Sequence, residues 1–107
     1  MRFQIVLAPE AAWAYRVLGA RLRAAVRDAL ETHLRHEPRK VSKSRKKRLR
    51  GLRQPHFRLR VGDLRLFYDV TDQAVEILAI VTKAQAERWL AEKGTTDPDG
   101  RPGEGEG

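Results

Sequence analysis

The fold of this chain is decided by one stretch, Phe57-Arg-Leu-Arg-Val-Gly-Asp-Leu-Arg-Leu-Phe-Tyr-Asp-Val70. Apolar and polar residues alternate on both sides of Gly62-Asp63, which is the pattern of two half-buried strands. Glycine in the first position of a two-residue loop favours a type II′ turn, so we expect a β-hairpin with a fixed register. That register pairs Val61 with Leu64, Arg60 with Arg65, Leu59 with Leu66, Arg58 with Phe67, and Phe57 with Tyr68.

The predicted register divides the hairpin into an apolar face and a basic face. The aliphatic pairs share the face that packs on helices, and the other face carries Arg58, Arg60 and Arg65. Like charges directly opposite each other, with Cβ atoms about 4.5–5.5 Å apart, are destabilising. An anion lying across the arginines removes that cost, because guanidinium groups bind phosphate oxygens in bidentate fashion. The alternative is that the arginines splay into solvent or pair with Asp63, Asp69 or Glu76.

The remaining periodicity places this hairpin in an α+β fold. We expect a first strand over residues 3–7, a helix from Pro9 to about Leu18, and a helix from about Arg21 to His36. The helices form an antiparallel hairpin because Gly19 separates them, and Pro38 ends the second. A nearly all-apolar strand, Val75–Val81, and a short helix, Lys83–Lys93, follow. The sequence thus predicts one antiparallel sheet of four strands, formed by the N-terminal strand and a three-stranded meander. The helical hairpin is expected to cover one face of this sheet.

A basic segment joins the second helix to the sheet. Residues 39–53 hold nine basic residues and no acid, so we interpret them as a mobile connector that adds phosphate contacts. The candidate residues are Lys43, Lys46, Lys47, Arg48, Arg50 and Arg53. The run Lys43–Arg50 lacks the apolar face of an interfacial helix, which argues against a membrane-surface role.

Composition limits the kind of partner and the compartment. The chain has a net charge of +8. Residues 94–107 contain four acids and one arginine, and we interpret them as a disordered acidic tail. Residues 1–93, which we expect to form a single domain, therefore have a net charge of +11. Such an excess attracts nucleic acid, an anionic membrane surface or an acidic protein, unless it only reflects an arginine-rich genome. We expect a cytoplasmic protein, because we find no signal peptide and no apolar run long enough to span a membrane.

No metal or cofactor site is expected. The chain has no cysteine, and His33 and His36 have only Glu37 nearby. A small-molecule cofactor is not expected either, because no glycine-rich phosphate loop or nucleophile elbow is found.

A family resemblance rests on the same residues. The segment Lys46-Lys-Arg-Leu-Arg-Gly-Leu52, followed by Phe57–Val70 and the apolar strand Val75–Val81, resembles the signature of RelE/ParE toxins over residues 2–90. RelE-type members cleave messenger RNA on the ribosome with a basic cluster and no metal. The resemblance implies that Arg58 and Arg60 hold the paired basic positions, that Arg65 holds the arginine after the turn, and that Lys83 lies in or beside the basic site.

The resemblance implies a cleavage reaction. The ribose 2′-OH attacks the adjacent phosphate and leaves a 2′,3′-cyclic phosphate and a 5′-OH, and cationic groups stabilise the charge that builds up in the transition state. Arg65 is the expected phosphate clamp, with Arg60 beside it. Arginine keeps its proton, so the proton acceptor is either Lys83, if neighbouring cations lower its pKa, or His56.

Two departures from the family pattern keep other functions open. Ala84 follows Lys83 where active members often carry arginine, and the terminal aromatic residue is Trp89 rather than tyrosine. Trp89 could stack on a base, but a core anchor between helix and sheet is the favoured reading. The alternatives are a ParE-like inhibitor of DNA gyrase without nuclease activity, or a catalytically inactive relative. All three readings imply an acidic antitoxin as partner, and the first adds the ribosome and messenger RNA.

Overall fold

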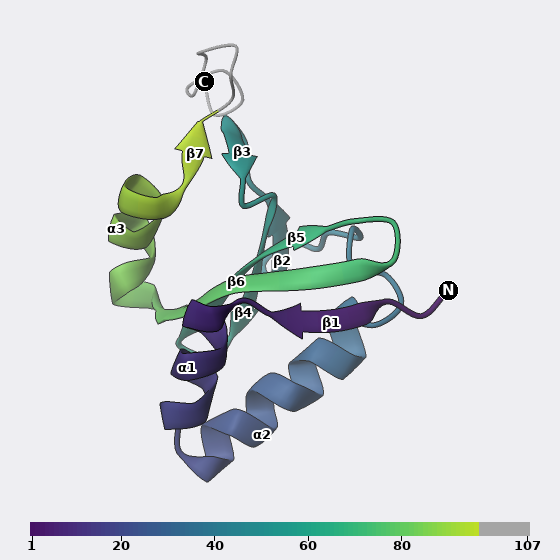
Figure 1. Ribbon diagram of the computed structural model, residues 1–107, viewed down its shortest axis with the longest axis vertical. Coiled ribbons are helices and arrows are strands. Elements are labelled where there is room, and N and C mark those ends of the chain that lie inside the picture. The colour runs from purple at the N-terminus through teal and green to yellow at the C-terminus, as the bar shows by residue number, and fades with distance from the viewer. Residues whose placement is uncertain (97–107) are drawn as a thin grey trace.

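The computed structural model describes residues 1–96, and residues 97–107 lie outside the described part. The elements follow in the order β1 Gln4–Leu7, α1 Pro9–Val17, α2 Ala20–Ala29, a π-helical turn η1 Leu30–Leu34, β2 Lys46–Arg48, β3 Leu52–Gln54, β4 Phe57–Val61, β5 Leu64–Val70, β6 Ala74–Thr82, α3 Lys83–Lys93 and β7 Thr95–Thr96 (Figure 1). The α+β class is confirmed, and the predicted helices and hairpin strands lie close to their expected positions. The expected long second helix is α2 continued by η1.

The β4–β5 hairpin has the predicted register throughout. Arg60 faces Arg65, and Phe57 faces Tyr68 at the other end of the pairing. Gly62 adopts φ +57° at the first central position of the turn, where a type II′ turn requires a positive φ. This conformation is accessible to glycine without the steric cost that a Cβ brings. The turn therefore fixes which side chains share a face.

The main sheet has five strands in the order β1-β6-β5-β4-β2, so the expectation of four antiparallel strands is wrong in two respects. First, β1 runs parallel to β6. Periodicity carries no information on strand direction, and two helices and several strands separate β1 from β6, so no tight turn forces an antiparallel pairing. Second, β2 adds an edge strand beside β4, with Lys47 opposite Arg58.

The basic segment is therefore not the mobile connector that its composition suggested. Backbone hydrogen bonds extend the β2–β4 pairing at both ends, from the Leu49 amide to the His56 carbonyl (2.8 Å) and from the Arg60 amide to the Arg45 carbonyl (2.8 Å). Ladder bonds use the backbone and do not depend on apolar side chains. A second pairing, β3 with β7, includes Thr95 and Thr96, which the disordered tail was expected to contain. The remainder of that prediction, residues 97–107, falls outside the described residues.

Helices cover both faces of the main sheet. In Figure 1, α1 and α2 lie on one side of the strands and α3 lies on the other. Trp89 of α3 stacks on Phe67 of β5, with ring centroids 5.1 Å apart and planes 9° from parallel. Its indole N–H donates to a Glu10 carboxylate oxygen (2.7 Å). Trp89 is thus the anchor between helix and sheet that the sequence favoured, and β5 is buried from Leu64 to Asp69.

The described residues contain no helix that is both long and apolar enough to cross a membrane.

A buried tyrosine links the inner face of the sheet to the end of the helical hairpin. Tyr68 is fully buried, stacks on Phe57 at 5.3 Å, and donates its hydroxyl hydrogen to the Pro38 carbonyl (2.9 Å). Burial raises the pKa of the Tyr68 hydroxyl. The bond satisfies a carbonyl in the segment that leads into β2.

We expect Tyr68→Phe to lower the free energy of unfolding by about 1–3 kcal/mol, because it leaves the Pro38 carbonyl buried without its donor. Urea denaturation measures the change. Tyr15→Phe is the control, because its hydroxyl contacts Arg27 on an exposed surface and its removal should change stability by less than about 0.5 kcal/mol. Equal losses in the two variants would contradict the assignment.

Candidate functional site

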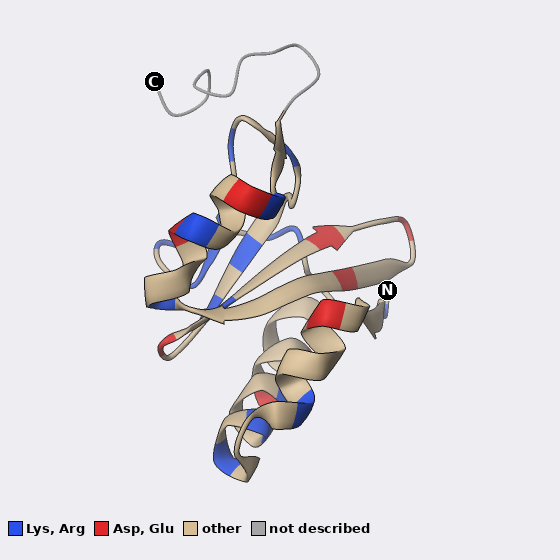
Figure 2. Ribbon diagram, turned by 60° about the vertical axis from the view of Figure 1, so that its left-hand side comes forward, with Lys and Arg blue, Asp and Glu red and all other residues tan. Residues whose placement is uncertain are grey.

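The face of the sheet that carries Lys47, Arg58, Arg60 and Arg65 forms the candidate site, here called the basic face. Lys47 stands opposite Arg58, and Arg60 stands opposite Arg65, so the four residues occupy neighbouring positions on three adjacent strands, β2, β4 and β5. Figure 2 shows basic positions on the strands beside α3 and also along the helical hairpin. The edge strand β2 brings Lys47 to this face.

Arg58 occupies the centre of the basic face and carries the clearest electrostatic signature. One terminal nitrogen donates to the Ser44 carbonyl (2.9 Å), while its Nε is buried and has no partner within the described residues. Burial lowers the pKa of Arg58, and the charges of Arg65 and Arg60 lower it further. The guanidinium is therefore held in a place where an additional anion would be favourable.

Arg60 and Arg65 share a row but differ in accessibility. Arg60 is exposed, and its terminal nitrogen approaches the Ser44 hydroxyl at 3.4 Å. Arg65 is only 8% exposed, and its Nη1 donates to the Gly62 and Leu64 carbonyls, each at 3.0 Å. Neither arginine is paired with a carboxylate in the described part of the chain. Arg65 secures the turn, and Arg60 presents its charge to solvent.

Lys83 lies at the turn end of the basic face. It is the first residue of α3, and its backbone N–H donates to the Asp63 carbonyl (2.7 Å), which ties the helix to the hairpin turn. The helix starts here because Thr82 and Gln85 form a capping box. The Lys83 side chain is exposed.

His56 lies at the opposite end of β4 beside a carboxylate that the sequence did not single out as a site residue. The His56 backbone N–H donates to Asp69 Oδ1 (2.7 Å), and the imidazole Nδ1 lies 3.5 Å from the same oxygen. Gln54 Nε2 donates to Asp69 Oδ2 (2.6 Å). The hairpin register carries this signal, because continuing it by one residue brings His56 opposite Asp69. Ser44 gave no comparable signal, because its position depends on β2.

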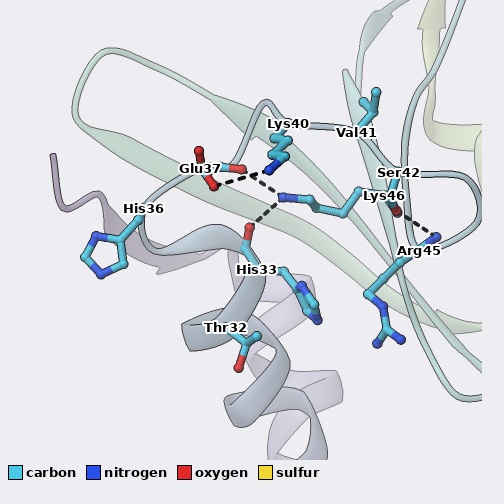
Figure 3. A pocket seen from close by; sticks show the side chains of 9 residues that line it. All are labelled: Thr32, His33, His36, Glu37, Lys40, Val41, Ser42, Arg45 and Lys46. Carbon is cyan, nitrogen blue, oxygen red and sulfur yellow. Dashed lines mark hydrogen bonds and ion pairs between the residues drawn. The ribbon is translucent and has the colours of Figure 1, made fainter.

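Lys46, expected to bind RNA, points to the other side of the sheet. It is 6% exposed, and its ammonium group donates to the carbonyls of His33 and Glu37, both at 2.8 Å (Figure 3). Burial lowers the pKa of Lys46. Its charge satisfies carbonyls beyond the end of the second helix, where cations are favoured. The structure thus removes Lys46 from the predicted RNA-binding set.

The other basic residues of the connector segment are divided between two surfaces. Arg48 lies over the Phe57 ring on the inner side, 5.6 Å from its centroid. Lys43, Arg50 and Arg53 are exposed and do not belong to the cross-strand pairs of the basic face. Only Lys47 of the predicted set joins the paired arginines directly.

The described residues contain no group of three or more histidine, cysteine, aspartate or glutamate residues placed to hold a metal ion. The paired residues of the basic face are cations, so this face can bind a phosphate and stabilise added negative charge.

Solved structures with this fold include toxin–antitoxin proteins. The chain is similar to a chain of the toxin–antitoxin complex RelBE2 from Mycobacterium tuberculosis, with 27% identity and a TM-score of 0.62 over 77% of this chain and 99% of that one. It has the fold of a chain of the YoeB dimer from Staphylococcus aureus, with 15% identity and a TM-score of 0.57 over 74% of this chain and 94% of that one. It also has the fold of a chain of the archaeal RelE–RelB complex from Pyrococcus horikoshii OT3, with 20% identity and a TM-score of 0.52 over 79% of this chain and 99% of that one.

A search of curated proteins finds no match to this chain. The model of the family described as the ParE toxin of the type II toxin–antitoxin system parDE matches residues 7–87, which include both helices of the hairpin, the β4–β5 turn and the start of α3. The chain therefore belongs to this family of type II toxins within the RelE/ParE superfamily.

Proposed function

We propose that this toxin is a ribosome-dependent endoribonuclease that cleaves messenger RNA and arrests translation. The observation that carries the proposal is the row Arg60–Arg65 beside Arg58, three like charges on one face without a carboxylate to neutralise them in residues 1–96. Such an arrangement costs stability unless an anion occupies it. An RNA phosphate matches that requirement, and action on the ribosome would place the protein in the cytoplasm.

In this proposal the arginines act on the charge of the reacting phosphate. Arg60 binds a non-bridging oxygen, because it is the exposed member of the row, and Lys47 contacts a neighbouring phosphate. Arg58 and Arg65 contribute positive potential from partly and fully buried positions. The phosphorane formed by 2′-OH attack carries more negative charge than the ground state, so a fixed cationic face stabilises it preferentially. The products are a 2′,3′-cyclic phosphate and a 5′-OH, and no metal or cofactor is required.

The proton acceptor for this reaction is Lys83 or His56. Lys83 lies beside the turn that carries the arginine row, and His56 immediately precedes β4, the strand of Arg58 and Arg60. Among the exposed residues of the connector segment, Lys43, Arg48, Arg50 and Arg53 would hold more distant phosphates.

The partner that restrains the toxin is an acidic antitoxin. Two of the similar structures, RelBE2 and RelE–RelB, are described as toxin–antitoxin complexes. A net charge of +8 on this chain favours a partner of opposite charge, and a disordered acidic segment gains both neutralisation and apolar burial when it folds on such a surface.

A gyrase inhibitor without nuclease activity is the second candidate. The matching family model is that of the ParE toxin. Ala84 stands where active nucleases of the superfamily often have arginine, and Trp89, stacked on Phe67, is not free to take the role of a catalytic tyrosine.

Arg60→Ala is expected to abolish codon-phased cleavage, because it removes the accessible charge of the row. Mapping of transcript 5′ ends during growth arrest measures this, and the Arg60→Ala/Arg65→Ala double variant should behave alike. Arg21→Ala is the matched control, since it removes an exposed arginine from α2 and should leave cleavage at the wild-type level. Intact transcripts in wild-type arrest, together with blocked supercoiling in vitro, would favour the gyrase function.

Adjacent lysines are expected to behave differently. Lys46→Met should lower the free energy of unfolding by about 1–3 kcal/mol, because two carbonyls lose a charged donor. Lys47→Met should leave stability within about 0.5 kcal/mol of wild type, since Lys47 is exposed, and should weaken binding to single-stranded RNA. Thermal unfolding and fluorescence anisotropy make the two measurements. Weaker RNA binding by a fully stable Lys46→Met variant would restore Lys46 to the RNA-binding set.

The complex with the antitoxin encoded in the neighbouring reading frame is expected to weaken steeply with salt. The Debye length falls from about 10 Å at 0.1 M to about 3 Å at 1 M, which screens contacts between exposed charges. Titration calorimetry at 0.05, 0.15 and about 0.5 M NaCl gives the dependence. Equal affinity at all three concentrations would refute an electrostatic interface.

A further inference from the structure

A cavity continues the basic face beyond Arg58, at the end of β4 that is remote from the turn. Its volume is about 430 Å³, and it is lined by Arg53, Gln54, His56, Asp69 and Thr95. His56 immediately precedes β4, and its carbonyl accepts a hydrogen bond that extends the β2–β4 pairing. In such extended backbone the side chains of His56 and Arg58, two residues apart, share a face about 7 Å apart. A nucleotide bound at the arginines therefore has this cavity next to it.

Asp69 is held rigidly at the wall of this cavity. It is 7% exposed, and both of its oxygens are occupied, Oδ1 by the His56 backbone N–H (2.7 Å) and Oδ2 by the Gln54 amide (2.6 Å). A carboxylate fixed in this way faces His56 Nδ1 at 3.5 Å. This contact favours the imidazole tautomer in which Nδ1 carries the proton and Nε2 keeps a lone pair.

The other imidazole nitrogen remains accessible. The His56 side chain is 41% exposed, and within residues 1–96 no hydrogen bond or ion pair engages Nε2. A buried carboxylate, an oriented imidazole and a free nitrogen in a cavity are the elements of a general base with its orienting partner.

We infer that His56 is the proton acceptor of the cleavage reaction and that Asp69 is the positioning residue that orients it, with Arg53 binding a phosphate of the nucleotide in the cavity. This inference rests on the proposed nuclease function. Lys83 is the weaker acceptor, because its side chain is exposed and within residues 1–96 no hydrogen bond or ion pair orients its ammonium group.

The reaction balances with the groups named. His56 Nε2 takes the proton of the ribose 2′-OH as the 2′-oxygen forms its bond to phosphorus. The bond from phosphorus to the 5′-oxygen breaks, and the leaving oxygen takes a proton from water. The hydroxide so formed takes the proton from the imidazolium, which returns histidine to its neutral form, and no oxidant, metal or further reactant is consumed.

Several charged groups face this imidazole besides Asp69. Glu76 of β6 stands opposite Asp69, Arg53 lines the cavity, and Arg58 is the second residue of β4. Glu76 therefore offers a control for Asp69, because it is a carboxylate of the same cross-strand row.

Ribosomes programmed with a defined messenger RNA supply the kinetic test for the full-length toxin. His56→Gln should lower kcat by about 10²–10⁴-fold with little change in KM. Added imidazole should partly rescue His56→Ala. Asp69→Asn should lower kcat at least about tenfold, whereas Glu76→Gln, which removes a carboxylate from the same row, should not.

Nitrogen-15 spectra of the histidine side chains give a readout independent of activity. The His56 ring should show the Nδ1–H tautomer in the wild type and lose that preference in Asp69→Asn. An Nε2–H tautomer in the wild type, or wild-type kcat in His56→Gln, would overturn the inference while leaving the nuclease function standing. A wild-type toxin that cleaves no message would overturn both.

Discussion

The register of one hairpin governs most of what this protein presents to its surroundings. Gly62 adopts φ +57° so that a two-residue turn joins β4 to β5, and from that point each residue of β4 has a fixed partner on β5. Because side chains alternate between faces, a slip of one residue would exchange the arginines with the core. The turn is reinforced from outside the strands by the Arg65 guanidinium and by the backbone N–H of Lys83.

The basic face exists because the two faces of the sheet are covered to different extents. The α1–α2 hairpin covers the inner face, where Tyr68 and its apolar neighbours are buried. On the outer face, α3 reaches Phe67 through Trp89, and the basic residues lie around that contact. Arg58 and Arg60 therefore stay close together without a carboxylate between them in the described chain, held only by contacts to Ser44. Such a cluster stores electrostatic repulsion that an anionic ligand can relieve.

The same hairpin connects the fold to function at both of its ends. At the turn end, Arg60 faces Arg65 and the Lys83 backbone is bonded to the turn, and at the other end His56 contacts Asp69. A polyanion lying along β4 would contact both ends, with the phosphate at the arginines and the sugar toward the imidazole. Because Ala84 and Trp89 depart from the pattern of active nucleases, the proposed nuclease function depends on this arrangement along β4.

The sequence by itself determined the helices, the hairpin strands and their register, because periodicity, alternation and a glycine turn are local signals. It also indicated Trp89 as a core anchor and placed the three arginines on one face. Only the tertiary structure decided which cations are available. Lys46 and Lys47 are adjacent lysines in the sequence. Because β2 pairs with β4, Lys46 points toward the carbonyls at the helix end and Lys47 lies on the face of the arginines. The basic segment gave no alternation from which that pairing could be inferred, since ladder bonds between backbones leave no mark on side-chain composition. The burial of Arg65 and the contact between His56 and Asp69 likewise depend on distances between strands, which the order of residues does not specify.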